Sequence, residues 1–188
     1  MEKKPILVVF FVATIVSIAY GIPASPEALE KWLETQYPAK EKVTRLVFYV
    51  RDVISTPTPT NVAVARATST IGSPTNFGLV EVIDDPVTVG PEPGSKIIGR
   101  AEGIIARASL EEISLHMTFT IVFTDGEYNS STLSFVGHNA YLTKLRHISI
   151  VGGTGAFAFA RGVTFIDTVW SNSSGDAVFR YDSVLVHY

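Results

Sequence analysis

Hydrophobic and polar residues alternate along the chain from residue 43 onward. In the first such segment, 43–54, one face of the expected strand carries mostly apolar side chains. The positions on this face are Thr44, Leu46, Phe48, Val50, Asp52 and Ile54. Similar segments follow between turn signals and add up to about eight strands, with no long helix and no βαβ alternation. We therefore predict an all-β fold, an eight-stranded antiparallel β-barrel over 43–188 that leaves no exposed edge, with a β-sandwich as the alternative.

The N-terminal part of the chain has a different pattern. Residues 1–21 carry two lysines, then an apolar run from Ile6 to Ala19 that is followed by small residues. This arrangement is typical of a cleaved secretory signal peptide, and the run is short for the alternative, a membrane anchor. Residues 22–42 are expected to form an N-terminal arm, in which 27–37 can form a short helix between two prolines.

Composition narrows the class of protein further. The chain has no cysteine, so a secreted domain of this sequence must be stabilised by core packing, barrel closure or oligomerisation instead of disulfides. A net charge of −3 without a long basic run argues against nucleic-acid binding. Two sequons, at Asn129 and Asn172, lie in polar turn-like stretches and are predicted glycosylation sites.

The stretch VGGTGAFAFARG, at 151–162, has the G-x-G-x-x-A spacing of a dinucleotide-binding turn. Such a turn must open a helix whose N-terminus faces the pyrophosphate. The phenylalanines that follow Gly155 instead alternate with alanines, which is the period of a strand. We therefore predict a tight turn between two antiparallel strands, the second of which starts at Ala156.

Four residues offer side chains for proton transfer or anion binding. Asp52 shares a face with apolar residues, so it is either a carboxylate in an apolar cavity or a strand end in solvent. Asp84 and Asp85 form a carboxylate pair, yet Asp before Pro is also ordinary turn chemistry that would stop the strand. Arg146 either pairs with an anion or lies on the surface.

Other kinds of site lack their residues. The four histidines fit no metal-ligand spacing, and no serine lies in a G-x-S-x-G elbow. We therefore expect neither a metal ion nor a cofactor.

Several motifs, in order along 43–188, resemble those of the plant dirigent protein family. They are LVFYVRDVI, NFGLVEVIDDPVTVG, IGRAEGIIARAS, LTKLRHISIVGGTGAFAFARG and GDAVFRYDSVLVHY. The resemblance implies a barrel similar to allene oxide cyclases, secretion to the apoplast (the extracellular space) and a homo-oligomer, usually a trimer, with a dimer as the alternative. The last motif is similar to the divergent branch of the family that includes the pterocarpan synthases.

The resemblance implies a phenolic partner and leaves three activities open. Dirigent proteins orient phenoxy radicals, such as those a laccase makes from coniferyl alcohol, so that coupling gives an optically active lignan. Pterocarpan synthases are lyases that dehydrate a hydroxyisoflavan-4-ol and close a ring through a quinone methide. A third possibility is a wall or defence protein that binds phenolics without turnover.

The family's pocket residues carry over position by position. Asp52 in RDVI and Arg146 before the glycine motif match a catalytic aspartate and arginine. Thr168 matches a pocket threonine and shares strand parity with Trp170. Asn139 stands where lignan-forming members carry a second aspartate, and an amide hydrogen-bonds but is no general base. This departure and the last motif favour the lyase slightly, whereas the size and diversity of the family favour the broader activity. We therefore predict a dirigent protein that directs the coupling of monolignol radicals to an optically active lignan, with the lyase as the alternative.

Further substrate contacts are expected from the neighbours of these residues. Phe48 and Val50 share the face of Asp52, and Asp84 offers the nearest additional carboxylate. We predict that all three contact the phenolic substrate.

Overall fold

The computed structural model describes residues 25–36, 40–144 and 146–188. The predicted signal peptide, 1–21, lies outside these residues. Helix α2 (Pro26–Gln36) forms where a short helix is expected. Ser25 caps its N-terminus, since the Ser25 hydroxyl accepts a hydrogen bond from the Ala28 amide at 3.2 Å. No helix within the described residues has the length and apolar character needed to cross a membrane.

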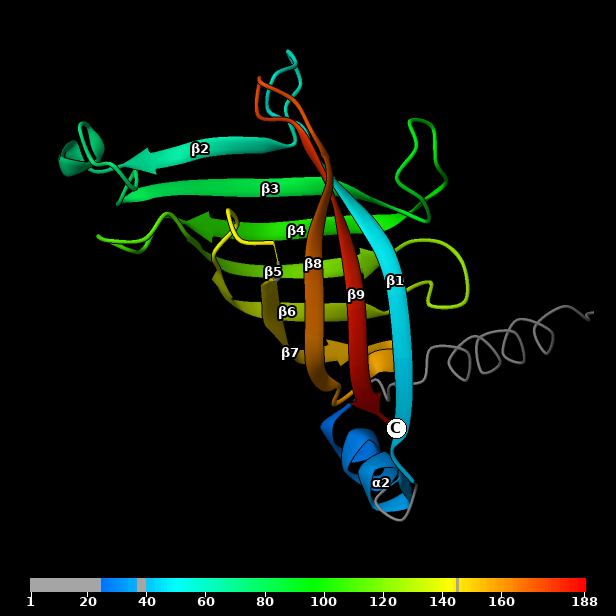
Figure 1. Cartoon of the computed structure of the whole chain (residues 1–188). Helices are drawn as coiled ribbons and strands as arrows, with labels where there is room; N and C mark the ends of the chain where they lie inside the picture. The colour runs from blue at the N-terminus through cyan, green and yellow to red at the C-terminus, as the bar shows by residue number, and fades with distance from the viewer. Residues whose placement is uncertain (1–24, 37–39, 145) are drawn as a thin grey trace, which may run out of the picture.

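The domain is a closed antiparallel β-barrel, as predicted (Figure 1). Nine strands form one sheet, and eight of them close the barrel because β1 also pairs with β3. The strands are β1 (Lys42–Asp52), β2 (Asn61–Arg66), β3 (Leu79–Thr88), β4 (Ile97–Ala106), β5 (Leu115–Phe123), β6 (Thr132–Asn139), β7 (Arg146–Thr154), β8 (Arg161–Ser171) and β9 (Ala177–His187). Strand β2 pairs with β3 alone and lies outside the closed ring.

The barrel closes where β1 and β2 share one edge of β3. The first half of β3 pairs with β2, from Leu79 to Ile83, and its end pairs with β1 through Val87 and Thr88. Pro86 falls in the gap between these two pairings, where its missing N–H leaves no ladder hydrogen bond unmade. The expectation that Asp85-Pro86 ends the strand is therefore wrong, and β3 continues to Thr88.

The glycine stretch forms a turn, but the strand after it starts later than predicted. Gly155 has a φ of +63° and begins a short 3-10 helix, Gly155–Phe157, so β8 starts only at Arg161. A side chain at Gly153 would lie 2.7 Å from the Phe157 carbonyl oxygen, which explains the glycine there. The strand expected from Ala156 is interrupted because Phe157 turns inward and is fully buried at one end of the barrel.

Aromatic rings fill the middle of the barrel. Phe48 stacks on Tyr181 with ring centroids 5.3 Å apart, and Phe119 stacks on Phe135 at 4.8 Å. The two stacks meet edge to face, since the Phe119 and Tyr181 rings lie at 81° to one another. This cluster separates the end that Phe157 closes from the opposite end, which is hollow.

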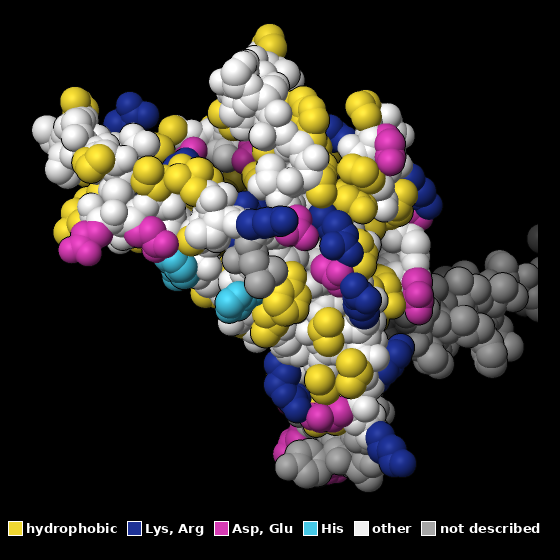
Figure 2. Space-filling view, viewed as in Figure 1, with side chains coloured by type: hydrophobic (Ala, Val, Ile, Leu, Met, Phe, Trp, Pro, Cys, Tyr) yellow, Lys and Arg dark blue, Asp and Glu magenta, His cyan; other side chains and the backbone are white. Residues whose placement is uncertain are grey.

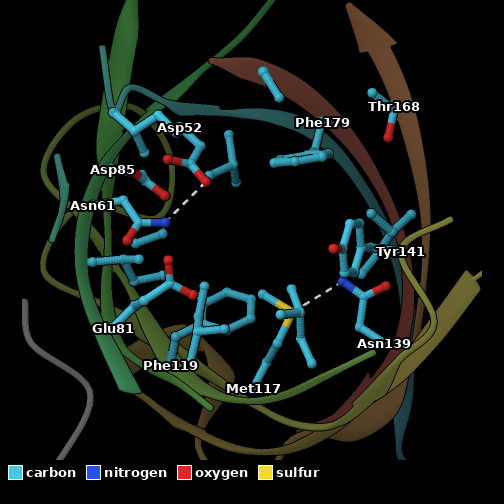
Figure 3. Close-up of a pocket in the computed structure, with 18 of the residues that line it drawn as sticks. Asp52, Asn61, Glu81, Asp85, Met117, Phe119, Asn139, Tyr141, Thr168 and Phe179 are labelled. Atoms are coloured by element: carbon cyan, nitrogen blue, oxygen red, sulfur yellow. Dashed lines mark hydrogen bonds between the residues drawn. The ribbon is translucent and has the colours of Figure 1, made fainter. Parts of the chain in front are cut away.

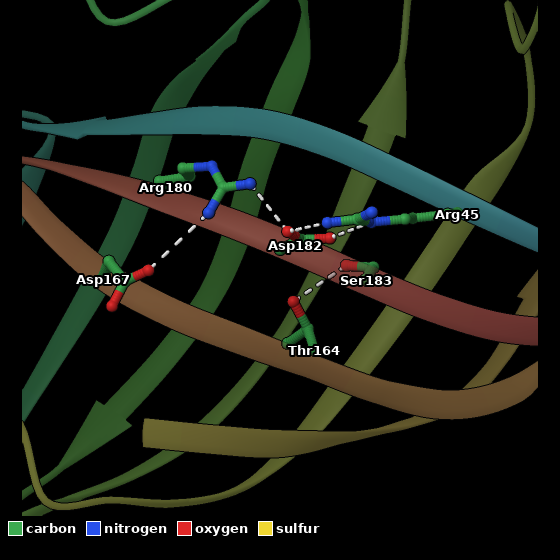
Figure 4. Close-up of polar contacts among 6 residues, drawn as sticks. All are labelled: Arg45, Thr164, Asp167, Arg180, Asp182 and Ser183. Carbon is green, nitrogen blue, oxygen red and sulfur yellow. Dashed lines mark hydrogen bonds and ion pairs between the residues drawn. The ribbon is translucent and has the colours of Figure 1, made fainter. Parts of the chain in front are cut away.

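Charged side chains connect three strands on the outside of the barrel (Figure 4). Asp182 of β9 accepts two hydrogen bonds from Arg45 of β1, at 2.6 and 2.7 Å, and one from Arg180. Arg180 also lies 3.7 Å from Asp167 of β8. Figure 2 shows such groups of both signs among apolar side chains on this face. Exposed pairs of this kind contribute little stability, so the aromatic core and the ladder hold the barrel together.

The buried position of Phe157 yields a stability prediction. Its ring packs on Phe123 and Tyr128, at 5.6 and 4.7 Å between centroids, so Phe157→Ala should cost about 3–5 kcal/mol. Phe159, two residues on, is 49% exposed, and Phe159→Ala is expected to cost less than about 1 kcal/mol. Urea denaturation at one protein concentration measures both, and equal costs would contradict this account of the turn.

Candidate functional site

The hollow end of the barrel holds a cavity of about 350 Å³ (Figure 3). The rings of Phe119, Tyr181 and Phe179 line it together with aliphatic residues from β1, β3, β4, β5 and β8. Polar side chains face the cavity from its two sides in Figure 3, with Asp52 and Asp85 on one side and Asn139 on the other. An apolar, aromatic cavity with a few placed polar groups is typical of a site for a small aromatic molecule.

Barrel closure places two carboxyl groups together. Val50 of β1 pairs with Val87 of β3, so the next inward positions on these two strands are Asp52 and Asp85. The strands separate at this point, and the two side chains point toward one another in the space between them (Figure 3).

The carboxyl groups have different partners. Asp85 is 2% exposed and accepts a hydrogen bond from the Thr60 hydroxyl at 2.5 Å. Asp52 accepts one from the Asn61 amide at 3.2 Å through Oδ2, whereas its buried Oδ1 has no hydrogen-bond partner. An oxygen of this kind is available to a proton or to a ligand hydroxyl.

Burial favours the protonated form of both acids. Burial, with a smaller contribution from the negative charge of Asp52, raises the pKa of Asp85 to about 8. Burial also raises the pKa of Asp52 to about 6, against the opposing hydrogen bond from Asn61. Near neutral pH the pair therefore holds about one proton, mainly on Asp85, and can both donate and accept.

Arg146 lies behind the cavity wall. Its guanidinium donates to the Tyr141 carbonyl at 2.7 Å and to the Thr168 hydroxyl at 3.0 Å. It also lies 5.7 Å from the centre of the Phe179 ring. Burial lowers the pKa of Arg146. Arg146 is thus positioned to orient Thr168 and Phe179, which line the cavity, and does not line it itself.

Asn139 and Thr168 face the cavity on the side away from the acid pair (Figure 3). The Asn139 amide donates to the Met117 sulfur at 3.1 Å, and its buried Oδ1 has no hydrogen-bond partner. Trp170 does not share the face of Thr168, because a β-bulge between them moves Trp170 to the outside and Ser171 to the cavity.

Of the other three residues expected to contact the substrate, one lines the cavity and two do not. Val50 lines the cavity, whereas Phe48 lies in the aromatic cluster beneath it. The placement of Asp84 in the pocket is wrong: strand alternation turns it outward, where it forms an ion pair with Arg100. The adjacent Asp85 takes the inward position.

Among the cavity residues that the sequence did not predict are three charged or phenolic side chains at one end of the cavity, Glu81, Arg107 and Tyr141. Glu81 has the same strand parity as Asp85, a signal that could have found it. Arg107 and Tyr141 follow the ends of β4 and β6, where strand periodicity no longer predicts which way a side chain points. Arg107 lies 3.6 Å from Glu81 and donates to the Tyr141 hydroxyl at 2.7 Å.

The sequons lie at opposite ends of the barrel. Asn129 is in the loop between β5 and β6, at the closed end. Asn172 is in the turn after β8, near the cavity, and its amide donates to Asp176 at 3.0 Å. Within the described part of the chain, no group of three or more His, Asp or Glu side chains could hold a metal ion.

The raised pKa values predict how stability depends on pH. Between the ordinary aspartate pKa of 3.8 and about 8, folded Asp85 binds more proton than unfolded Asp85, so its contribution to stability falls as pH rises. The free energy of unfolding of Asp85→Asn minus that of wild type should therefore increase with pH, by up to about 1.4 kcal/mol per pH unit.

Asp84→Asn is the matched control, because its carboxylate lies outside the cavity. Urea unfolding at several pH values measures both differences. Parallel pH curves for Asp85→Asn and wild type would show that Asp85 binds no extra proton on folding.

Known proteins match this chain over nearly the whole barrel. The sequence model of the Dirigent-like protein family matches residues 43–186. Dirigent protein 21 of Arabidopsis thaliana is 44% identical over 158 residues, which are 82% of this chain and 84% of that protein. Pterocarpan synthase 1 of Glycyrrhiza echinata is 40% identical over 183 residues, 95% of this chain and 93% of that protein.

A solved structure agrees with these matches. The structure of a pterocarpan synthase dirigent protein superposes with a TM-score of 0.73 at 44% identity, covering 79% of this chain and 87% of that one. The family match, the relatives and the shared barrel therefore agree that this chain belongs to the dirigent protein family.

Proposed function

We propose that this chain is a lyase of the pterocarpan synthase kind, which dehydrates a hydroxyisoflavan-4-ol and closes a ring through a quinone methide. The observation that carries the proposal is the pair of carboxyl groups, the buried Asp85 beside Asp52, in an aromatic cavity, where burial raises the pKa of both. Loss of a hydroxyl group needs a proton donor, and ring closure needs a proton acceptor. A carboxyl pair that holds about one proton supplies both.

The first step is removal of water. Asp85 donates its proton to the 4-hydroxyl, the carbon–oxygen bond breaks and water leaves. The electrons come from the conjugated phenol, which releases its own proton toward the open mouth of the cavity and becomes the carbonyl of a quinone methide. The aromatic walls hold the planar intermediate and keep bulk water away from it.

The second step is ring closure. A hydroxyl group on the second ring attacks the former C4 carbinol carbon, and its proton passes to the Asp52–Asp85 pair, which restores the starting acid. The quinone methide oxygen regains a proton at the mouth, so the net change is loss of one water molecule. Asn139 and Thr168, across the cavity, are placed to orient the second ring.

The relatives support this choice at the level of the family. A pterocarpan synthase matches 95% of this chain, and Asn139 replaces the second aspartate that lignan-forming members carry. The acid pair here uses Asp85 instead, from the neighbouring strand.

A second candidate is stereoselective coupling of phenoxy radicals, with an oxidase such as a laccase acting upstream. The supporting observation is that Asp52, Arg146 and Thr168 gather around one cavity, Arg146 through its bond to Thr168. In this reaction the cavity orients two monolignol radicals, and the acid pair serves the cyclisation of the quinone methide that coupling produces.

We further propose the setting in which either reaction takes place. Residues 1–21 direct secretion to the apoplast, Asn129 and Asn172 carry glycans, and the barrel assembles as a homotrimer. The supporting features are the apolar leader, the two sequons in loops and the resemblance to secreted family members.

The decisive variant for the lyase is Asp85→Asn. We expect it to lower the rate of dehydration of a hydroxyisoflavan-4-ol, without any oxidant, by at least about 100-fold, because an amide donates no proton. Asp84→Asn should keep wild-type activity. Product is measured by chiral chromatography against the spontaneous rate.

A parallel assay with coniferyl alcohol and a laccase separates the candidates. Wild-type protein that gives one pinoresinol enantiomer and no dehydration would replace the lyase with the second function. If neither assay gives its product, the remaining candidate function is binding of phenolics without turnover.

A further inference from the structure

A polar bridge crosses the mouth of the cavity outside the acid pair. Arg107, just after β4, lies between Glu81 of β3 and Tyr141, just after β6. Its Nη1 donates to the Tyr141 hydroxyl at 2.7 Å, and the guanidinium lies 5.0 Å from the centre of the same ring. All three residues line the cavity, yet neither step above assigns them a role.

The bridge fixes the direction of the Tyr141 hydroxyl. An arginine only donates, so the Tyr141 oxygen accepts and its hydrogen must point away from Arg107. Figure 3 shows this hydroxyl facing the cavity. A cation that donates to a phenol also makes that phenol a stronger donor. Tyr141 is therefore a donor aimed at whatever occupies the cavity.

The bridge is attached to β3 beyond the acid pair. Glu81 and Asp85 lie four residues apart on the same face of β3, which is about 13 Å along a strand. The bridge thus lies beyond Asp85 toward the mouth, and Tyr141 faces Asp52 and Asp85 from across the cavity (Figure 3). A substrate with its leaving hydroxyl at Asp85 directs its other end toward Tyr141.

We propose that Tyr141, held by Arg107, binds the oxygen at the remote end of the substrate and so selects aromatics that carry a phenol there. The proposal rests on the lyase function above. It assigns Tyr141 to direct substrate contact, and Arg107 to positioning Tyr141.

The Tyr141 hydroxyl stabilises the negative charge that develops on the substrate during the reaction. As the carbon–oxygen bond at Asp85 breaks, the remote phenol becomes the carbonyl of the quinone methide, with partial negative charge on its oxygen. The Tyr141 hydroxyl donates to that oxygen without losing its proton, and the hydrogen bond strengthens as the charge grows. No atom is gained or lost at this end beyond the phenolic proton, which leaves before and returns after ring closure.

The test compares two products that differ by one oxygen. Equilibrium binding to the purified protein is measured for a pterocarpan with the remote hydroxyl and for its deoxy analogue. Wild type should prefer the hydroxy compound, and Tyr141→Phe should weaken that compound about fivefold or more while leaving the deoxy analogue unchanged. Tyr128→Phe, at the closed end of the barrel, is the matched control and should match wild type.

Steady-state kinetics distinguishes direct contact of Tyr141 with the substrate from a purely structural role of Tyr141 at the mouth of the cavity. Tyr141→Phe should lower kcat for the hydroxyisoflavan-4-ol about tenfold or more, with a smaller change in KM. Arg107→Met should have a similar effect, and Arg107→Lys, which keeps a cationic donor, should recover part of it.

The binding test and the turnover test can fail independently of one another. If wild type turns over the substrate and Tyr141→Phe keeps both the hydroxy preference and kcat, the Tyr141 contact is wrong and the lyase stands. If wild type turns over no substrate, the lyase is wrong, and a hydroxy preference that Tyr141→Phe abolishes still supports the contact. Equal binding of the two products by wild type overturns the contact.

Discussion

The site depends on one constraint, the closure of the barrel through a short pairing between β1 and β3. Only Tyr49–Thr88 and Val50–Val87 form this pairing, because β2 occupies the rest of the same edge of β3. The register makes Asp52 and Asp85 the next inward positions on the two strands, and the separation of β1 from β3 beyond this pairing opens space between them. Closing the fold thus brings together two acids that are 33 positions apart in the sequence.

The surroundings then separate the roles of these acids. The aromatic cluster under the cavity and the burial of Asp85 keep one proton on the pair, whereas the amide of Asn61 favours the charged form of Asp52. At the mouth, the Arg107 guanidinium lies between Glu81 and Tyr141 and supplies hydrogen-bond donors in place of carboxyl groups. One cavity therefore holds an acid pair at depth and hydrogen-bond donors near the mouth, the two kinds of group that the proposed reaction through a quinone methide uses.

Period-two alternation predicted the strands of the barrel and placed Asp52 and Val50 on the same strand face. It failed where local geometry departs from the period. Pro86 continues a strand because it falls in a gap, Phe157 turns inward after Gly155, and a bulge exposes Trp170.

Errors in the predicted site have the same physical origin. Asp84 and Asp85 are adjacent residues of the same type, and only the register of β3 decides which side chain points into the barrel. Arg107 and Tyr141 lie beyond the strand ends, where their directions depend on a contact between distant segments. Such contacts become visible only when the fold is known.

The most direct test of the account is an NMR titration of the aspartate carboxyl carbons, with Asp52→Asn and Asp85→Asn used for assignment. We predict that the Asp85 carbon titrates near pH 8 and the Asp52 carbon near pH 6, and that Asp52→Asn lowers the pKa of Asp85, because the negative charge of Asp52 contributes to raising it. Both carbons titrating near the ordinary value of about 4, independently of one another, would contradict a shared proton in this cavity.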